Sequence, residues 1–149
     1  MSFCYNNFQA GMKGDQYMER ILWHGSPVRT DRLIPKQAYD TGFREGCRLA
    51  VYATSMRNMA ICFALGCVYN EPAAGKEAKR TMMPEYGDKM VFEGCHPNYG
   101  GKGYLYKLDG SRFVHSMGTQ WVCFEEVTPL EIIEIDVDDY LDLCIVKNS

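Results

Sequence analysis

The chain lacks the features that mark membrane, secreted and nucleic-acid-binding proteins. Its longest apolar stretches, such as 60–68, fall far short of the roughly 20 residues that span a bilayer. Its N-terminus lacks the basic-then-apolar order of a signal peptide. The 16 Lys and Arg residues are scattered among 19 Asp and Glu residues, so no basic patch could follow a phosphate backbone. We therefore expect a cytoplasmic protein that binds neither membranes nor duplex nucleic acid.

Motifs that hold metals or nucleotide phosphates are also missing. The seven cysteines include no C-x-x-C pair and no Cys/His quartet at zinc-site spacing, so we predict no metal site and mostly reduced core cysteines. Cys95 and His96 are adjacent, but a nucleophile and its base meet in space rather than in sequence, so we expect neither to be catalytic. Neither G-x-G-x-x-G nor G-x-x-x-x-G-K-[ST] occurs. A bound nucleotide would need another kind of site.

What is present fits one soluble globular domain over residues 1–149. The composition is 46% hydrophobic and 23% charged, within the ordinary range for such domains. No internal repeat, low-complexity block or linker divides the chain. A domain of this size buries roughly 68–70% of the surface of its unfolded chain, which suffices for a core without cross-links.

Short segments rich in β-branched and aromatic residues, bounded by turn residues, predict six or seven strands. The candidate strands are 21–24, 49–53, 90–93, 104–108, 113–115, 120–125 and 130–135. The stretches 29–46 and 70–87 are expected to be irregular. The strands do not alternate with helices as in βαβ folds, so the pattern predicts the α+β class.

One clear helix is predicted over about 56–65, with Thr54 or Ser55 as its N-cap. Met56, Met59, Ala60 and Phe63 recur with a 3.6-residue period, which predicts that they form the buried face. A last helical turn is expected over 136–143.

Three places put polar or aromatic groups at the boundary of a predicted strand. His24-Gly25-Ser26 combines a ring nitrogen, an unhindered backbone and a hydroxyl, which together can hold a carboxamide and a sugar hydroxyl. Tyr52 precedes the predicted helix, whose aromatic residue could face it across a flat heterocycle. Gln120 begins the strand that also carries Trp121.

The order of these three elements resembles the His, Tyr, Glu signature of the ADP-ribosyltransferase fold, in the branch that includes diphtheria toxin and the poly(ADP-ribose) polymerases. The resemblance covers roughly residues 20–136 and is most specific at Leu22-Trp23-His24-Gly25-Ser26. It implies a split, mainly antiparallel sheet sandwich with a few short helices. It also implies NAD as the substrate and ADP-ribosyl transfer as the glycosyltransferase reaction.

The resemblance assigns roles position by position. His24 and Ser26 would contact ribose hydroxyls, and the Gly25 main chain would pair with the nicotinamide amide. Tyr52 would form one wall of the nicotinamide slot and Phe63 the other. A serine of the family falls at Ala60 here, so one hydrogen bond to the amide is missing.

The family's catalytic Glu falls on Gln120, the largest departure from the signature. A carboxylate there orients the ribose and opposes the positive charge that develops on it, whereas an amide can only orient. Losing such a contact typically costs about 10²–10³ in rate. Glu125 and Glu126 are the nearest carboxylates, and strand alternation places Glu126 on the face of Gln120. Because Glu126 lies about 20 Å along the strand, it could substitute only after a bulge or another register.

Three functions therefore stay open. The first is an NAD-dependent ADP-ribosyltransferase that acts on a protein or another acceptor, or hydrolyses NAD, with His24, Tyr52 and Gln120 as its catalytic residues. The second is a module of the same fold that binds NAD or an ADP-ribose-like ligand without turnover. The third is a protein-interaction domain with a tyrosine-rich surface, formed by Tyr39, Tyr69, Tyr86, Tyr99, Tyr104 and Tyr106.

Overall fold

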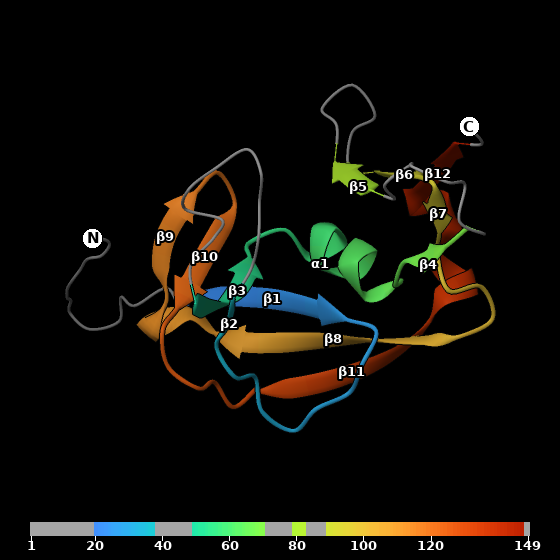
Figure 1. Ribbon diagram of the computed structural model, residues 1–149. Helices are drawn as coiled ribbons and strands as arrows, with labels where there is room; N and C mark the ends of the chain where they lie inside the picture. Colours follow the sequence, from blue (N-terminus) through green and yellow to red (C-terminus); the bar gives the residue numbers. More distant parts are fainter. Residues whose placement is uncertain (1–19, 38–48, 71–78, 83–88, 148–149) are drawn as a thin grey trace.

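A mainly antiparallel sheet of seven strands forms the larger part of the computed structural model, which describes residues 20–37, 49–70, 79–82 and 89–147 (Figure 1). The strands are ordered β11–β8–β1–β3–β10–β9, and β2 pairs with β3 beside this path. Their bounds are β1 (Ile21–Ser26), β2 (Lys36–Gln37), β3 (Leu49–Thr54), β8 (Lys102–Asp109), β9 (Val114–Met117), β10 (Gln120–Cys123) and β11 (Glu131–Asp136).

Two smaller sheets lie at the other end of the view in Figure 1. One has the order β12–β6–β5 and contains the parallel pair β12–β6, and the other pairs β4 with β7. These strands are β4 (Val68–Tyr69), β5 (Lys79–Met82), β6 (Met90–Glu93), β7 (Cys95–His96) and β12 (Cys144–Lys147). The helices are α1 (Arg57–Ala64) and the 3-10 helices Gly110–Arg112 and Val137–Leu143.

This arrangement confirms the predicted α+β class and its mainly antiparallel strands. Each predicted strand has a counterpart, and the last helical turn is the second 3-10 helix. The sequence patterns missed β2, β4, β5, β7 and β12. Neither length nor hydrophobicity marked four of them, because β2, β4 and β7 have two residues each and β5 opens on two basic residues. Strand β12 was missed although it contains Ile145 and Val146. No helix within the described ranges is long and apolar enough to cross a bilayer.

Helix α1 lies across β1 and β8 at two glycines (Figure 1). A Cβ atom on Gly25 would lie 1.7 Å from the carbonyl oxygen of Ala60. A Cβ atom on Gly103 would lie 2.2 Å from the carbonyl oxygen of Ala64. Only glycine allows the helix backbone to come this close to the sheet.

The predicted buried face of the helix was right for Ala60 and wrong for Phe63, and Met56 and Met59 are partly buried. The buried residues of α1 are Ala60, Ile61, Cys62 and Ala64. Phe63 is 40% exposed. The reason is the close approach to the sheet, which places small residues underneath and turns the bulky ring outward.

The start of the helix also differs from the prediction. The N-cap is Met56, which makes no side-chain capping bond. The predicted cap Thr54 instead lies at the end of β3, where its hydroxyl accepts a hydrogen bond from the Met56 amide at 3.0 Å. Thr54 therefore still supports the first turn of α1, from two residues before the N-cap.

The core beneath the seven-stranded sheet includes Leu22, Val51, Leu108 and Tyr106. Tyr106 is fully buried, which contradicts its place in a tyrosine-rich surface. Tyr104 is partly buried, whereas Tyr69 and Tyr99 are exposed. The remaining members of that predicted surface, Tyr39 and Tyr86, lie outside the described residues.

Candidate functional site

The two neighbours of β1 pair with it over very different lengths. Strand β8 pairs with all of β1, through six residue pairs from Ile21–Asp109 to Ser26–Tyr104. Strand β3 pairs with β1 at one position, Trp23–Thr54. Beyond that position the β1–β3 side of the sheet has no backbone ladder among the described residues, and the sheet opens there.

The His24 side chain crosses this opening. Its Nδ1 atom lies 2.7 Å from the carbonyl oxygen of Tyr52. Burial lowers the pKa of His24 from its ordinary value of 6.5; the Tyr52 hydrogen bond acts in the opposite direction, and the charge of Lys36 lowers the pKa further. The ring is therefore neutral at pH 7. Because a carbonyl can only accept, Nδ1 carries the proton and Nε2 is left as an acceptor.

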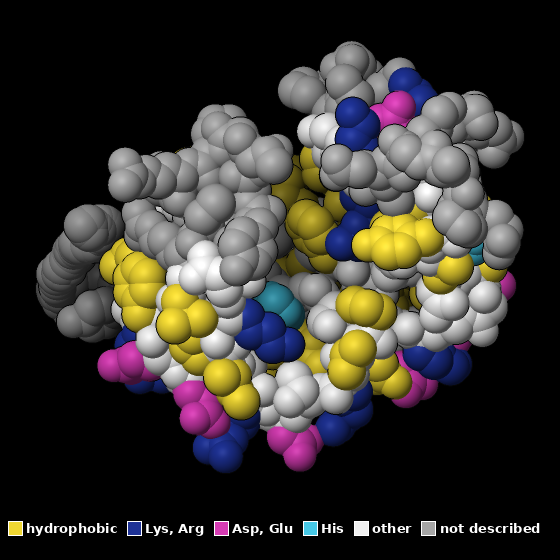
Figure 2. All heavy atoms as spheres, viewed as in Figure 1, with side chains coloured by type: hydrophobic (Ala, Val, Ile, Leu, Met, Phe, Trp, Pro, Cys, Tyr) yellow, Lys and Arg dark blue, Asp and Glu magenta, His cyan; other side chains and the backbone are white. Residues whose placement is uncertain are grey.

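A cleft of about 230 Å³ lies at the opening. Its polar lining combines His24, Ser26, Thr30 and Tyr52 with the basic residues Arg32 and Lys36. Its apolar lining consists of Val28, Leu33, Ile34, Ala50 and Val51. In Figure 2 a histidine lies in a hollow of this face, next to basic side chains. Ligand sites often have this composition, an apolar wall with a few polar groups that fix orientation.

The charge of the cleft is positive. Lys36 is exposed, and no carboxylate pairs with it within the part of the chain that the structure describes. The Nη1 atom of Arg32 lies 2.7 Å from Oε2 of Glu126, so this charge is partly compensated at the rim. With His24 neutral, the cleft offers cations and hydrogen-bond donors to an anionic ligand.

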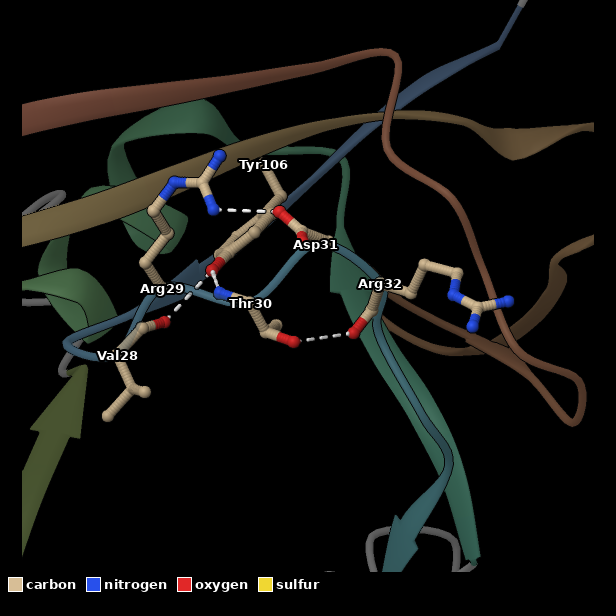
Figure 3. Close-up of polar contacts among 6 residues, drawn as sticks. All are labelled: Val28, Arg29, Thr30, Asp31, Arg32 and Tyr106. Atoms are coloured by element: carbon tan, nitrogen blue, oxygen red, sulfur yellow. Dashed lines mark hydrogen bonds and ion pairs between the residues drawn. The ribbon is translucent and has the colours of Figure 1, made fainter.

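A strap, here defined as residues 27–35 between β1 and β2, covers one side of the cleft. The buried Tyr106 hydroxyl donates to the carbonyl oxygen of Val28 at 2.9 Å and accepts from the amide of Thr30 at 2.8 Å (Figure 3). Burial raises the pKa of Tyr106, so its hydroxyl stays protonated at neutral pH. Further along, Leu33 and Val127 exchange two backbone hydrogen bonds of 2.8 and 2.9 Å.

The structure places Gln120 near the site but not in the lining of the cleft. It pairs with Thr54, which in turn pairs with Trp23. Gln120 therefore lies two strands, or about 10 Å, from Trp23. Its amide Nε2 lies 3.3 Å from the hydroxyl of Ser116 on β9. The three predicted motifs thus share three adjacent strands, β1, β3 and β10.

Ala60 and Phe63 are not among the residues that line the cleft. Ala60 lies on the buried face of α1, with its carbonyl against Gly25. The Phe63 ring is partly exposed, and the guanidinium carbon of Arg80 lies 5.4 Å from its centroid. The lining of the cleft therefore contains His24, Ser26 and Tyr52 but not the second predicted aromatic wall, Phe63.

The two alternative carboxylates have other partners. Strand β10 ends at Cys123, so the alternation that placed Glu126 on the Gln120 face does not reach it. Glu125 forms an ion pair with Arg112, and Glu126 pairs with Arg32 at the rim of the cleft. Glu126 therefore lies next to the strap, where it pairs with Arg32, and it does not belong to the strand of Gln120.

Cys95 and His96, which were not expected to act as a nucleophile and its base, each have other partners. Burial, together with the neighbouring Cys67 thiol, raises the pKa of Cys95 to about 11. The Nδ1 atom of His96 lies 2.7 Å from the carbonyl oxygen of Pro97. A raised pKa disfavours the thiolate, which is the nucleophilic form of cysteine. Among the described residues, no group of three or more His, Cys, Asp and Glu side chains could hold a metal ion.

Sequence reasoning missed Thr30, Arg32, Lys36 and Tyr106. Arg32 and Lys36 fall within a stretch predicted to be irregular, and their only signal was closeness in sequence to His24-Gly25-Ser26. Tyr106 is 82 positions from His24 in the chain but is its paired residue across β1 and β8. Only the strand register could connect these two residues.

In comparisons with known proteins, no family model, no curated protein and no solved structure matches the chain.

Proposed function

We propose that the protein is an NAD-dependent ADP-ribosyltransferase of the His, Tyr, Glu branch, with NAD bound in the cleft between β1 and β3. The observation that carries the proposal is the opening between these strands, crossed by the His24–Tyr52 hydrogen bond and lined by cationic side chains. The motif residues lie on three adjacent strands in the order that the resemblance requires.

The chemistry of the lining supports a dinucleotide. The Nε2 acceptor of His24 and the Ser26 hydroxyl suit ribose hydroxyl groups. Lys36 and Arg32 suit the diphosphate. A cleft of about 230 Å³ is smaller than the roughly 300–1,000 Å³ of most drug-sized ligand sites, so it would hold one half of NAD. The nicotinamide half would extend past Tyr52 toward the Gly25 main chain.

The proposed reaction breaks the bond between the nicotinamide nitrogen and C1′ of the ribose. The bonding electrons leave with neutral nicotinamide, and positive charge develops on the sugar. A nucleophile of the acceptor, or water, then forms the new bond to C1′ and loses its proton. In this scheme Tyr52 and the Gly25 backbone orient the nicotinamide, whereas His24 and Ser26 hold ribose hydroxyls.

Gln120 favours a second candidate function, an NAD-binding module with little or no turnover. An amide cannot oppose the positive charge on the ribose, and the Gln120 amide is hydrogen-bonded to Ser116. Glu126 would substitute only after release from Arg32. Both functions share the cleft and differ in whether the glycosidic bond breaks.

The test measures NAD binding by calorimetry and nicotinamide release with a panel of protein acceptors. For a transferase, we expect release above background, abolished in His24→Ala and retained in His115→Ala, which removes an exposed histidine outside the cleft. Saturable binding without release identifies the binding module, and Gln120→Glu should then raise release. Folded protein that neither binds NAD nor releases nicotinamide refutes both functions.

A further inference from the structure

We infer that Tyr106 is a positioning residue of the cleft, which holds the strap and the His24 ring in the geometry that receives the phosphate-bearing half of the ligand. This inference rests on the proposed function and adds a residue outside the His, Tyr, Glu signature. Tyr106 is not among the lining residues of the cleft, so it would act through groups that are.

The Tyr106 hydroxyl joins the strap to the sheet. It lies at the centre of a two-bond bridge, donating to the Val28 carbonyl and accepting from the Thr30 amide (Figure 3). Both Val28 and Thr30 line the cleft. Because the hydroxyl is buried, a nearby water cannot readily replace it. The position of the first turn of the strap therefore depends on this buried oxygen together with the Ser26 hydroxyl, which accepts from the Val28 amide at 3.1 Å in an exposed hydrogen bond.

The Tyr106 ring also packs against His24. The two residues are direct partners across β1 and β8, and their ring centroids lie 5.7 Å apart in an edge-on arrangement with an interplanar angle of 61°. The His24 ring is thus held at Nδ1 by the Tyr52 carbonyl and supported at its side by Tyr106. Tyr106 therefore contacts both the strap and His24, the residue proposed to bind the ribose.

The strap has a second attachment to the rest of the protein, so the role of Tyr106 is limited to the first part of the strap. The Leu33–Val127 backbone pair and the Arg32–Glu126 ion pair hold the later part of the strap. Loss of the Tyr106 hydroxyl should therefore displace Val28 and Thr30 without detaching the whole segment. The expected consequence is a weaker grip on the phosphate-bearing half of NAD, with little change at Gly25 and Tyr52.

The test compares Tyr106→Phe with Tyr104→Phe. Tyr104 lies two residues earlier on the same face of β8, is partly buried, and its hydroxyl has no hydrogen-bond partner among the described residues. Dissociation constants are measured for NAD and for nicotinamide alone by NMR titration. We expect Tyr106→Phe to weaken NAD binding about tenfold, equal to ~1.4 kcal/mol, and to change nicotinamide binding less than twofold. Tyr104→Phe should change neither.

Amide exchange of Thr30 provides a readout that needs no ligand. The Thr30 amide should exchange faster in Tyr106→Phe and at the wild-type rate in Tyr104→Phe. Equal weakening of both ligands would indicate a general loss of structure and overturn the inference, and so would unchanged NAD binding. If the wild type binds neither ligand, the proposed function fails first. The Thr30 exchange rate then decides whether Tyr106 holds the strap, and an unchanged rate overturns that as well.

Discussion

Strand β1 has a continuous edge and an open edge, and the contrast between them explains the site. On one side six residue pairs bind it to β8, including His24–Tyr106. On the other side the Trp23–Thr54 pair is followed by the cleft. A strand paired on one side and released on the other presents backbone and side-chain groups to a ligand while staying rigid.

The difference shows how polar groups are satisfied where a ladder stops. Buried carbonyl groups need hydrogen-bond partners, and the Tyr52 carbonyl obtains one from the His24 imidazole instead of from β1. A side chain has replaced a backbone donor. Because an imidazole has a second nitrogen, this replacement also supplies an acceptor to the cleft.

The largest expected effect is a loss of stability at Gly25, where α1 lies close to β1. Gly25→Ala should destabilise the fold by ~3 kcal/mol or more, because the new Cβ would lie 1.7 Å from the backbone oxygen of Ala60. Urea denaturation measures the change. The control Gly118→Ala introduces a methyl group with no heavy atom within 4 Å at a φ of +54°, so it should cost only about 1 kcal/mol. Equal losses in the two variants would contradict the close approach of α1 to β1.

A smaller effect is expected from breaking the bridge across the open side. His24→Ala leaves the Tyr52 carbonyl without its imidazole donor and should cost about 1–3 kcal/mol of unfolding free energy. The matched control is His115→Ala. His115 is exposed, and its Nε2 atom lies 2.9 Å from the Gly118 carbonyl in a surface turn, where water can replace it. A His24→Ala protein as stable as the His115→Ala protein would show that the bridge does not support the opening.

The same bridge predicts a dependence of stability on pH. The folded-state pKa of His24 lies below its unfolded value of 6.5, so below pH 6.5 the unfolded chain binds more protons than the folded one. The contribution of His24 is therefore complete above about pH 6.5. It declines as the pH falls toward the folded-state pKa, by at most about 1.4 kcal/mol per pH unit.

The measurement is the urea midpoint of wild type and His24→Ala between pH 7.5 and 5. The difference between the two proteins should shrink as the pH falls. A difference that stays constant or grows would mean that His24 is not held neutral in the folded state.

The smallest effect is expected from the exposed part of the strap. Arg29 and Asp31 form an exposed ion pair of 2.8 Å, and such pairs contribute little because solvent screens them. Arg29→Ala should leave both the urea midpoint and the Thr30 exchange rate unchanged. A large change in either quantity would mean that the surface charges of the strap, and not the buried Tyr106 hydroxyl, hold it in place.

The strands that carry the candidate site were predictable from the sequence because each is a short apolar segment with turn residues at its ends. The structure also brings His24, Ser26 and Tyr52 to one cleft, but only Ser26 ends its strand, whereas His24 and Tyr52 lie within β1 and β3. The buried face of α1 was not predictable in the same way. Its orientation follows from close contact with Gly25 and Gly103, and Gly103 is on a strand far along the chain.

The local patterns by themselves determined the α+β class, the main strands and the polar residues that these strands carry, because these depend on neighbours in the chain. Only the tertiary structure decided where β1 stops pairing with β3, which basic residues reach the opening, and that Tyr106 lies beside His24. These features depend on strand register and loop path, since both bring together residues that the chain keeps far apart.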